Sequence, residues 1–331
     1  MNQDLAEHPH TRREFLLRSA KAGALIAASS LAGFLLHDSK GPAASSDGDS
    51  GSVSLPDFSI PGLTSRMCIA TGDDRTRTAN LALKSLGGME TFVQRGDHVL
   101  IKVNAAFATP AILCATTHPD LVSEVVRLCI HAGAASVTVT DNPINDPESC
   151  FALTGIGEAA RSSGARLALP RQTDFHPTTV SGGMLIRKWP LLYEPFKGVN
   201  KVIGMAPVKD HHRSGASMSL KNWYGLLGGR RNIFHQDIHR LIQELALMIK
   251  PTLVILDGTF TMMTNGPTGG SLGDLKQTNT LIVSTDQVAA DAFGATLLGR
   301  SARDLPFIGK AAESGAGTQN FESLQPIRVT A

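Results

Sequence analysis

The sequence has few cysteines, and no two of them form a metal-binding motif. Its four cysteines, Cys68, Cys114, Cys129 and Cys150, include no C-x-x-C pair, which excludes the usual iron–sulfur and zinc-ribbon motifs from this chain. Cys129 has the spacing of an apolar helix face and is expected in the core. Cys114 and Cys150 each follow a predicted strand end, so a disulfide outside the cytoplasm is an alternative to two free thiols there.

The sequence also lacks an excess of one charge. It has 31 Lys and Arg residues against 29 Asp and Glu residues, a formal net charge of +2. Such a balance gives no global field that would attract nucleic acid or an anionic membrane surface, so neither is an expected partner. The His-Glu-x-x-His helix of zinc proteases and a catalytic-cysteine signature are also missing, which leaves the reaction class open. Any anion site has to be built from a local cluster of side chains.

The N-terminus carries the pattern of a twin-arginine export signal. Residues Thr11 to Leu16 read Thr-Arg-Arg-Glu-Phe-Leu, and the moderately apolar stretch 22–36 follows them. That stretch is shorter than the roughly 20 apolar residues of a membrane span. We therefore predict a signal segment at 1–44, the twin-arginine export machinery as a partner, and a periplasmic location. An uncleaved segment would act as an N-terminal membrane anchor.

The remainder of the chain is predicted to be a flexible linker over residues 45–60 and one α/β domain over residues 61–331. Short apolar strands are expected at 98–103, 136–140, 199–205, 252–256 and 280–284. Amphipathic helices are expected from Pro119 to Gly133 and from His235 to Lys250, and a further helix from the N-cap pair Thr285-Asp286. This alternation predicts a mainly parallel sheet flanked by helices, as one domain or as two packed α/β halves.

Several segments together resemble the family called domain of unknown function 362. The most specific is Lys221-Asn222 followed by Gly225-Leu226, with His235 and the loop Asn265-Gly266-Pro267 downstream. The resemblance spans roughly residues 65 to 300. The chain departs from the family after Lys209, where Asp-His-His stands in place of the more frequent Lys-Thr-His. Either histidine can therefore be the counterpart of the family's histidine, and the family name implies no activity.

Polar side chains follow the ends of the predicted strands, and these are the candidate site residues. In open α/β sheets, ligands bind beyond the carboxyl ends of the strands. Histidine can transfer a proton near neutral pH, and a buried lysine can serve as a base or an anion contact. The predicted catalytic residues are His211, His212 and Lys221. The predicted substrate-binding residues are Lys102, Asn104, Lys209, Asn222 and Asn265.

His235 and Asp257 are the candidate metal ligands. His235 extends the apolar stripe of its predicted helix and should point inward, whereas His239 lies off that stripe. Asp257 ends a predicted strand, where a carboxylate can bind a hard cation or simply form a turn with Gly258. The acidic residue Asp291 lies in a largely apolar predicted helix. The chain therefore has a candidate site for a divalent metal, without a motif that requires one.

Two functions fit these observations. The first is an exported enzyme that acts on a small anionic substrate, with or without a divalent metal. The second is a metal- or ligand-binding protein without turnover, accessory to a redox system that contains iron–sulfur proteins. Both use the same lysine-rich cluster, and only the first needs an activated base.

Overall fold

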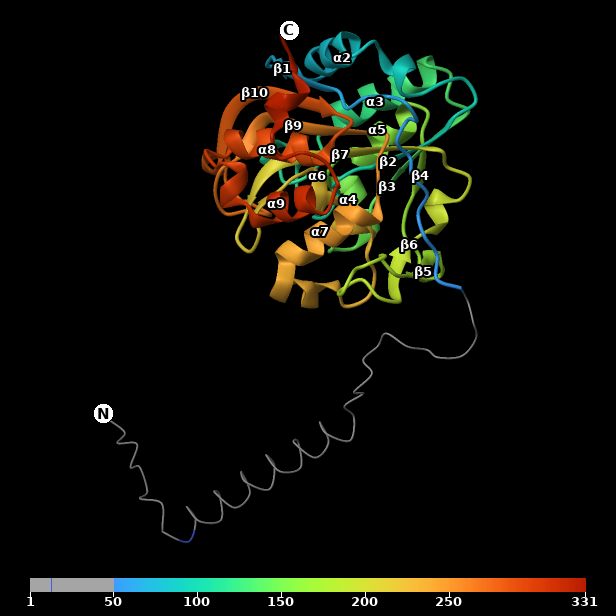
Figure 1. Ribbon diagram of the computed structural model, residues 1–331, viewed down its shortest axis with the longest axis vertical. Coiled ribbons are helices and arrows are strands. Elements are labelled where there is room, and N and C mark those ends of the chain that lie inside the picture. The colour runs from blue at the N-terminus through green and yellow to red at the C-terminus, as the bar shows by residue number, and fades with distance from the viewer. Residues whose placement is uncertain (1–12, 14–50) are drawn as a thin grey trace, which may run out of the picture. The chain divides into compact units, whose positions relative to one another are not determined.

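The central element of the protein is a large, mostly parallel β-sheet (Figure 1). The computed structural model describes Arg13 and residues 51–331. Within these residues the sheet has nine strands, in the order β11-β1-β10-β9-β7-β2-β3-β4, with β8 paired to β7. The strands are β1 (Met67–Thr71), β2 (His98–Lys102), β3 (Ser136–Thr140), β4 (Arg166–Ala168), β7 (Lys201–His211), β8 (Gly215–Ser217), β9 (Leu253–Met262), β10 (Leu275–Ser284) and β11 (Ile327–Thr330).

Two strands of the described sheet run against their neighbours. Strands β9, β7, β2, β3 and β4 run parallel to one another, whereas β10 is antiparallel to both β9 and β1, and β8 is antiparallel to β7. The predicted mainly parallel α/β fold is confirmed, and residues 51–331 form one unit around one continuous sheet. A separate two-stranded sheet pairs β5 (Phe175–Thr178) with β6 (Trp189–Leu192).

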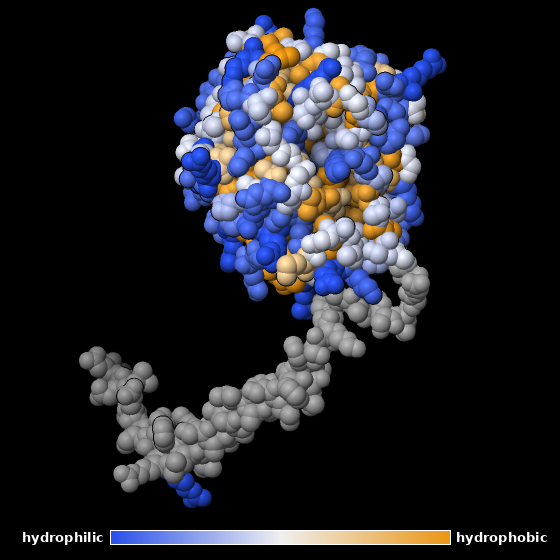
Figure 2. Space-filling model, in the orientation of Figure 1, coloured by the Kyte–Doolittle hydropathy of each residue, from blue (hydrophilic) through white to orange (hydrophobic). Residues whose placement is uncertain are grey.

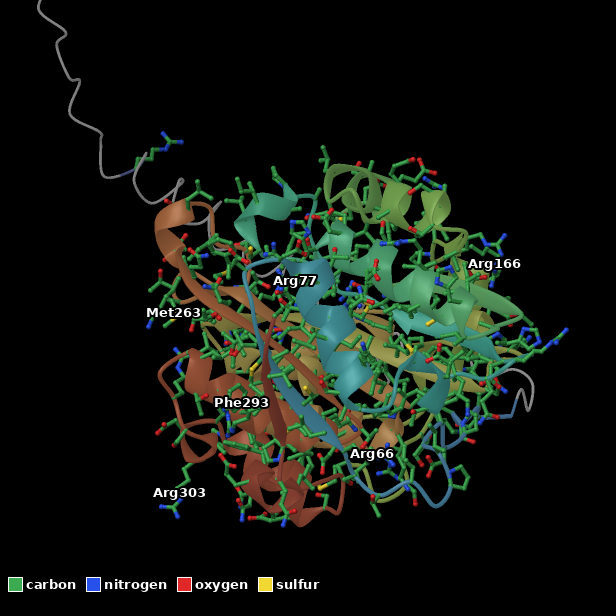
Figure 3. The ribbon with its side chains drawn as sticks, turned by 90° about the horizontal axis from the view of Figure 1, so that it is seen from above. Arg66, Arg77, Arg166, Met263, Phe293 and Arg303 are labelled. Atoms are coloured by element: carbon green, nitrogen blue, oxygen red, sulfur yellow. The ribbon has the colours of Figure 1, made fainter. Side chains whose placement is uncertain are left out.

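Helices cover both faces of the sheet and give it two cores. Side chains alternate along a strand, so Leu100 of β2 packs in one core and its neighbour Ile101 in the other. Burying one such side chain stabilises the fold by about 1.5–3 kcal/mol. One face carries α2 (Arg75–Ser85), α3 (Pro119–His131) and α5 (Ile156–Ser162), and the other carries α6 (Ser219–Asn222), α7 (Ile238–Met248), α8 (Gln287–Leu297) and α9 (Pro306–Glu313). The short helix α4 (Pro147–Leu153) packs against α5. In Figure 3, Arg77 marks α2 and Phe293 marks α8.

Two helix starts agree with the capping residues in the sequence. Helix α3 begins at Pro119, as predicted. Helix α8 begins after Asp286, whose carboxylate accepts hydrogen bonds from the backbone N–H groups of Val288 and Ala289. Both helices lie on the sheet with their apolar residues buried, so local capping and tertiary packing specify the same boundaries.

Several predicted element boundaries were wrong, and three of them concern candidate site residues. Strand β7 continues to His211, so Lys209 lies inside a strand instead of a loop. Strand β9 continues through Asp257 to Met262, because it pairs along its length with β10. Helix α7 begins at Ile238, and His235 belongs to the preceding 3-10 helix η7 (Arg231–Asp237).

Part of the predicted linker contacts the domain. Val53 forms a bridge with Thr178, and Phe58 is buried against Phe196. The predicted export signal lies outside the described residues apart from Arg13, which is exposed. Twin-arginine export and a periplasmic location therefore stay predictions.

The face of residues 51–331 seen in Figure 2 carries hydrophilic residues interspersed with hydrophobic patches. None of the helices described for Arg13 and residues 51–331 is long and apolar enough to cross a membrane. All four cysteines are buried and free, so the disulfide considered between Cys114 and Cys150 is not formed in this structure.

Candidate functional site

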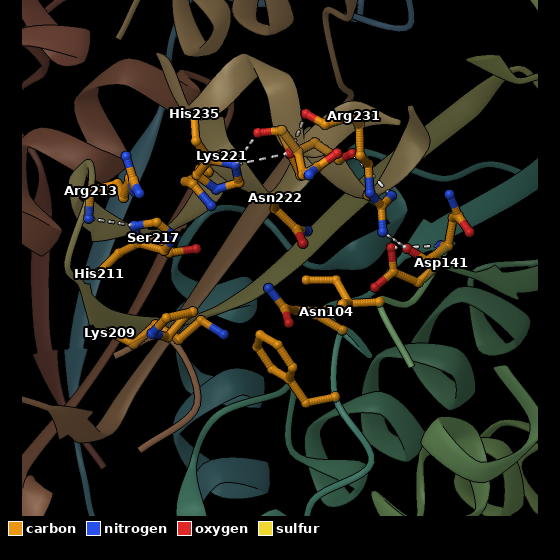
Figure 4. Close-up of a pocket in the computed structure, with 18 of the residues that line it drawn as sticks. Asn104, Asp141, Lys209, His211, Arg213, Ser217, Lys221, Asn222, Arg231 and His235 are labelled. Atoms are coloured by element: carbon orange, nitrogen blue, oxygen red, sulfur yellow. Dashed lines mark hydrogen bonds between the residues drawn. The ribbon is translucent and has the colours of Figure 1, made fainter. Parts of the chain in front are cut away.

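A cavity of about 380 Å³ lies beyond the carboxyl ends of the parallel strands β2 and β3, beside the last residues of β7. Because parallel strands end at the same edge of a sheet, the residues that follow them meet there. The structure brings eight of the ten predicted site residues into its lining (Figure 4): Lys102, Asn104, Lys209, His211, His212, Lys221, Asn222 and His235.

The two remaining candidates are not among the side chains that line the cavity. Asn265 donates a hydrogen bond to Asp274 Oδ1 at 2.6 Å, although Pro267 of the same loop does reach the cavity. Asp257 forms an ion pair with Arg75 at 2.7 Å and accepts a hydrogen bond from the Thr259 backbone N–H. The structure therefore does not join Asp257 to His235 as a pair of metal ligands.

No group of three or more His, Cys, Asp or Glu side chains converges as a metal site within the part of the chain that the structure describes. Residues 269–273 have the spacing Gly-x-Ser-x-Gly, but they do not form a nucleophile elbow. Ser271 is exposed and caps a single 3-10 turn by accepting a hydrogen bond from the Gly273 N–H.

Lys102 is held in a buried ion pair. Its Nζ lies 2.7 Å from Asp141 Oδ1 and donates hydrogen bonds to Val103 O at 2.8 Å and to Asn222 Oδ1 at 2.9 Å. Burial lowers the pKa of Lys102, and the Asp141 carboxylate opposes that shift. All three donors of the ammonium are used by the protein, so Lys102 and Asn222 support the site more than they contact a ligand.

Gly225 packs directly against this ion pair. A Cβ atom at Gly225 would lie 2.2 Å from Asp141 Oδ1 and 2.6 Å from Lys102 Nζ. Both distances are far below van der Waals contact, so only glycine fits here without displacing the pair. Gly225 lines the cavity together with Lys102 and Asp141.

Neither Lys209 nor Lys221 has a carboxylate partner within residues 51–331. Lys209 Nζ donates to Ala115 O and lies 5.2 Å from the centre of the Phe107 ring. Lys221 Nζ lies 5.1 Å from the centre of the Tyr224 ring and has no hydrogen-bond partner among the described residues. Burial, reinforced by neighbouring cations, lowers the pKa of each lysine to about 7.

The cavity is strongly cationic. Figure 4 shows Asp141 and Arg231 together on one side, and Lys209, Lys221 and the labelled histidines on the other. Among the described residues, Asp141 is the only carboxylate in the lining, and Lys102 already neutralises it. The lining cations are Lys102, Lys209, Lys221, Arg213 and Arg231. A small anion would supply the missing negative charge.

Three histidine rings are stacked at the edge of the cavity. The ring centres of His211 and His212 are 5.0 Å apart and those of His211 and His235 are 5.8 Å apart, with interplanar angles of 9° and 8°. His211 Nδ1 accepts hydrogen bonds from the backbone N–H groups of Arg213 and Ser214, both at 3.2 Å. These bonds assign the His211 proton to Nε2.

His211 is therefore a neutral hydrogen-bond donor. Burial and the nearby Lys221 lower the pKa of His211 to about 2. Its Nδ1 lone pair is already used, so this ring cannot accept a proton without breaking two backbone hydrogen bonds. The predicted catalytic role of His211 stays a prediction, and in this structure the ring can act as a fixed Nε2–H donor.

His235 has the opposite tautomer. Its Nδ1 donates to the carbonyl oxygen of Asn232 at 3.1 Å, which leaves the lone pair on Nε2. Burial lowers the pKa of His235 as well, so the ring is neutral at pH 7. His212, at the exposed rim, has Nδ1 3.3 Å from Gly266 O and in the same way keeps Nε2 free. His235 and His212 can accept a proton where His211 cannot.

Two further features mark the cavity as a ligand site. Asn104 Oδ1 is buried and has no hydrogen-bond donor within the described chain. A buried acceptor without a partner costs about 1–3 kcal/mol, which a ligand donor would recover.

Asp291 anchors the turn that carries Lys221 by accepting hydrogen bonds from the backbone N–H groups of Ser219 and Leu220 at 2.8 and 3.1 Å. Its burial raises its pKa to about 8.

Sequence reasoning did not single out Tyr224 and Arg231. Tyr224 lies in an apolar stretch of the sequence, but its ring lies beside Lys221 Nζ and its hydroxyl donates to Arg231 O at 2.6 Å. Arg231 donates to four backbone carbonyls, including Leu227 O at 2.9 Å and Asn142 O at 2.8 Å. The sequence shows Arg230 and Arg231 side by side, and no local pattern tells which of them turns inward.

The sequence profile of the family described as domain of unknown function (DUF362) matches residues 99–296. Thylakoid-associated protein sll1697 of Synechocystis sp. is 27% identical over 223 residues, which are 63% of this chain and 65% of that protein. The chain thus spans less than two thirds of this curated relative. The lactate racemase apoprotein from Thermoanaerobacterium thermosaccharolyticum aligns with a TM-score of 0.37 and 12% identity, over 71% of this chain and 57% of that one.

Proposed function

This chain belongs to the DUF362 family, and we propose that it is an enzyme that binds a small organic anion in the lysine-lined cavity and transfers a proton on it. The observation that carries the proposal is the charge balance of the cavity. Within residues 51–331, Lys209 and Lys221 are buried without a carboxylate partner, while the single lining carboxylate, Asp141, is paired with Lys102. A buried amine without a carboxylate resists protonation, so a bound anion stabilises the charged form of the lysine that it contacts.

The arrangement of the histidines supports acid–base chemistry on the bound anion. The Nε2–H of His211 can donate to a developing negative charge on an oxygen atom of the substrate. The free Nε2 of His235, whose ring stacks on His211, can accept a proton from the substrate and return it. A donor and an acceptor fixed side by side are what a proton transfer at a bound carboxylate or phosphate compound requires.

Calorimetric titration with a panel of small anions tests the binding part of this proposal. We expect at least one of phosphate, oxalate, succinate and pyruvate to bind the purified protein. Replacing Lys209 by Met should weaken that binding about tenfold or more, because a hydrogen bond to a charged group contributes about 1.5–3 kcal/mol. Replacing Lys221 by Met should weaken it less. Lys84→Met is the matched control, since Lys84 is exposed on α2 and does not line the cavity.

The outcomes separate the proposed enzyme from a protein that only binds its ligand. Equal affinity in wild type and in both cavity variants would refute the anion site. Turnover of the organic anions in the panel is measured by NMR in deuterated water, as exchange of their carbon-bound protons. Binding without such exchange would favour the non-catalytic alternative. Exchange that is lost in His235→Gln while binding is retained would support the enzyme.

A further inference from the structure

We propose that Lys221 is a nucleophile that forms an imine with the carbonyl carbon of a 2-oxo acid. The inference rests on the proposed function, because it names the class of small anion that the cavity accepts and the atom that reacts with it. It is drawn from the different surroundings of the three cavity lysines and from the tautomers of the two histidines beside Lys221.

Only one of the three lysines presents a free amino group to the cavity. Lys102 Nζ has three partners within 2.9 Å, and Lys209 Nζ is tethered to Ala115 O. Lys221 Nζ has no hydrogen bond and no ion pair among residues 51–331, and its nearest aromatic contact is the face of Tyr224. A side chain held by packing instead of by hydrogen bonds keeps its nitrogen available for a new bond.

The surroundings of Lys221 favour the neutral amine, which is the nucleophilic form. The residue is buried, and Lys102 and Arg231 place positive charge near it. A hydrophobic pocket and a second cation are the two devices by which proteins activate a lysine for imine formation. The remaining lysine, Lys209, stays available to hold the carboxylate of the substrate as an ammonium ion.

The neighbouring histidines can complete the condensation. The Lys221 nitrogen attacks the carbonyl carbon, a C–N bond forms, and the electron pair of the C=O π bond moves to oxygen, which the His211 Nε2–H stabilises. His235 Nε2 takes one proton from the nitrogen and passes it to the oxygen, which gives the carbinolamine. The hydroxyl group then receives the second nitrogen proton, again through His235, and leaves as water while the nitrogen electron pair forms the C=N bond. Amine and carbonyl compound thus give imine and one water molecule, without an oxidant or reductant.

A 2-oxo acid fits this cavity better than a simple carboxylate or an uncharged ketone. Its carboxylate can form an ion pair with Lys209, which has no carboxylate partner within residues 51–331. Its carbonyl oxygen can accept a hydrogen bond from the Nε2–H of His211. A volume of about 380 Å³ is at the lower end of the range for small-molecule sites, which suits a compound of a few carbon atoms.

Reductive trapping with pyruvate tests the proposal directly. The full chain is incubated with pyruvate and sodium cyanoborohydride, digested, and analysed by peptide mass spectrometry. We expect one carboxyethyl group on the peptide that contains Lys221, and no such group on the peptide that contains the exposed Lys84. Acetone replaces pyruvate as the uncharged control and should label Lys221 at least tenfold less, because it lacks the carboxylate.

The variants Lys221→Met and Lys209→Met distinguish the nucleophile from the residue that binds the carboxylate. The first should bind pyruvate but lose the adduct, and the second should retain Lys221 labelling only at higher pyruvate concentrations. The peptide mass spectrum of the labelled wild-type protein tests the proposal even if a variant misfolds. If pyruvate saturates the wild-type protein in calorimetry and Lys221 is still unlabelled, the imine is refuted and the anion site stands. If no anion of the panel binds, the proposed function fails together with it.

Discussion

Anion binding should take up a proton, and its affinity should fall as the pH rises above 7. In the empty cavity, burial lowers the pKa of Lys209 and of Lys221 to about 7, so both are largely neutral at pH 8. A bound carboxylate favours the ammonium form of the lysine that it contacts. We expect this lysine to be Lys209, since Lys221 has to stay neutral to act as a nucleophile.

The size of the effect follows from the pKa and from the groups that face Lys209. The neighbouring charges are Lys221 and Lys102, which lower its pKa, and Asp141, which raises it. Protonating a lysine with a pKa of about 7 costs about 1.4 kcal/mol for each pH unit above 7. Affinity should therefore fall about tenfold per unit, or about a hundredfold from pH 7 to 9. Below pH 7 the lysine is already charged and the affinity should level off.

Titration calorimetry in buffers of different ionisation enthalpy measures the proton uptake. Oxalate is a suitable titrant, because its charge is constant over this pH range, and the slope of the binding enthalpy against the ionisation enthalpy of the buffer gives the number of protons. We expect about one proton at pH 8. Lys209→Met should reduce the uptake to near zero, and Lys84→Met should leave it unchanged.

Two results would refute this reasoning. Affinity for oxalate that is the same at pH 7 and at pH 9, with no proton uptake, would mean that the cavity lysines are charged before the anion binds. Proton uptake that survives in Lys209→Met but vanishes in Lys221→Met would assign the titration to the other amine. In that case Lys221 would be the anion contact, and its role as the neutral nucleophile would be wrong.

Two further predictions concern the architecture of the site. Gly225→Ala should lower the free energy of unfolding by about 3 kcal/mol or more in chemical denaturation, because it displaces a buried ion pair. Gly309→Ala, on α9, where the added Cβ has its nearest contact at 3.7 Å, should be neutral or stabilising. In ¹⁵N NMR the His211 ring should stay neutral with its proton on Nε2 from pH 5 to 8, and His235 should carry its proton on Nδ1. A His211 that titrates in this range would contradict the assignment.

The fold was largely predictable because helix caps and apolar periodicity act locally. The apolar run of β2 and the proline that opens α3 specified both elements at their observed N-terminal boundaries. The lengths of β7 and β9 were not predictable in this way. Each strand continues past its apolar run into polar residues such as Lys209 and Asp257, because a neighbouring strand supplies hydrogen bonds that the sequence of one strand does not reveal.

The position of the site was predictable for a topological reason. Residues that follow parallel strands meet at one edge, and this rule placed Asn104, Lys209 and His211 near each other without any contact being known. Asp257 broke the rule, since its strand extends further and its carboxylate turns to Arg75. Asn265 is in the expected loop, but its side chain donates a hydrogen bond to Asp274, and Pro267 of the same loop lines the cavity instead.

The roles of the lysines could not be read from residue type or spacing. Lys102, Lys209 and Lys221 were all candidates for binding charge, yet one is neutralised by a carboxylate, one donates to a carbonyl, and one has no polar partner in the described structure. These differences depend on Asp141, Ala115 and the Tyr224 ring, which lie in other segments of the chain. The tautomers of His211 and His235 likewise depend on backbone groups that face each ring. The different roles of these three lysines therefore arise from the folded cavity, and a bound anion would contact three lysine side chains in three different chemical environments.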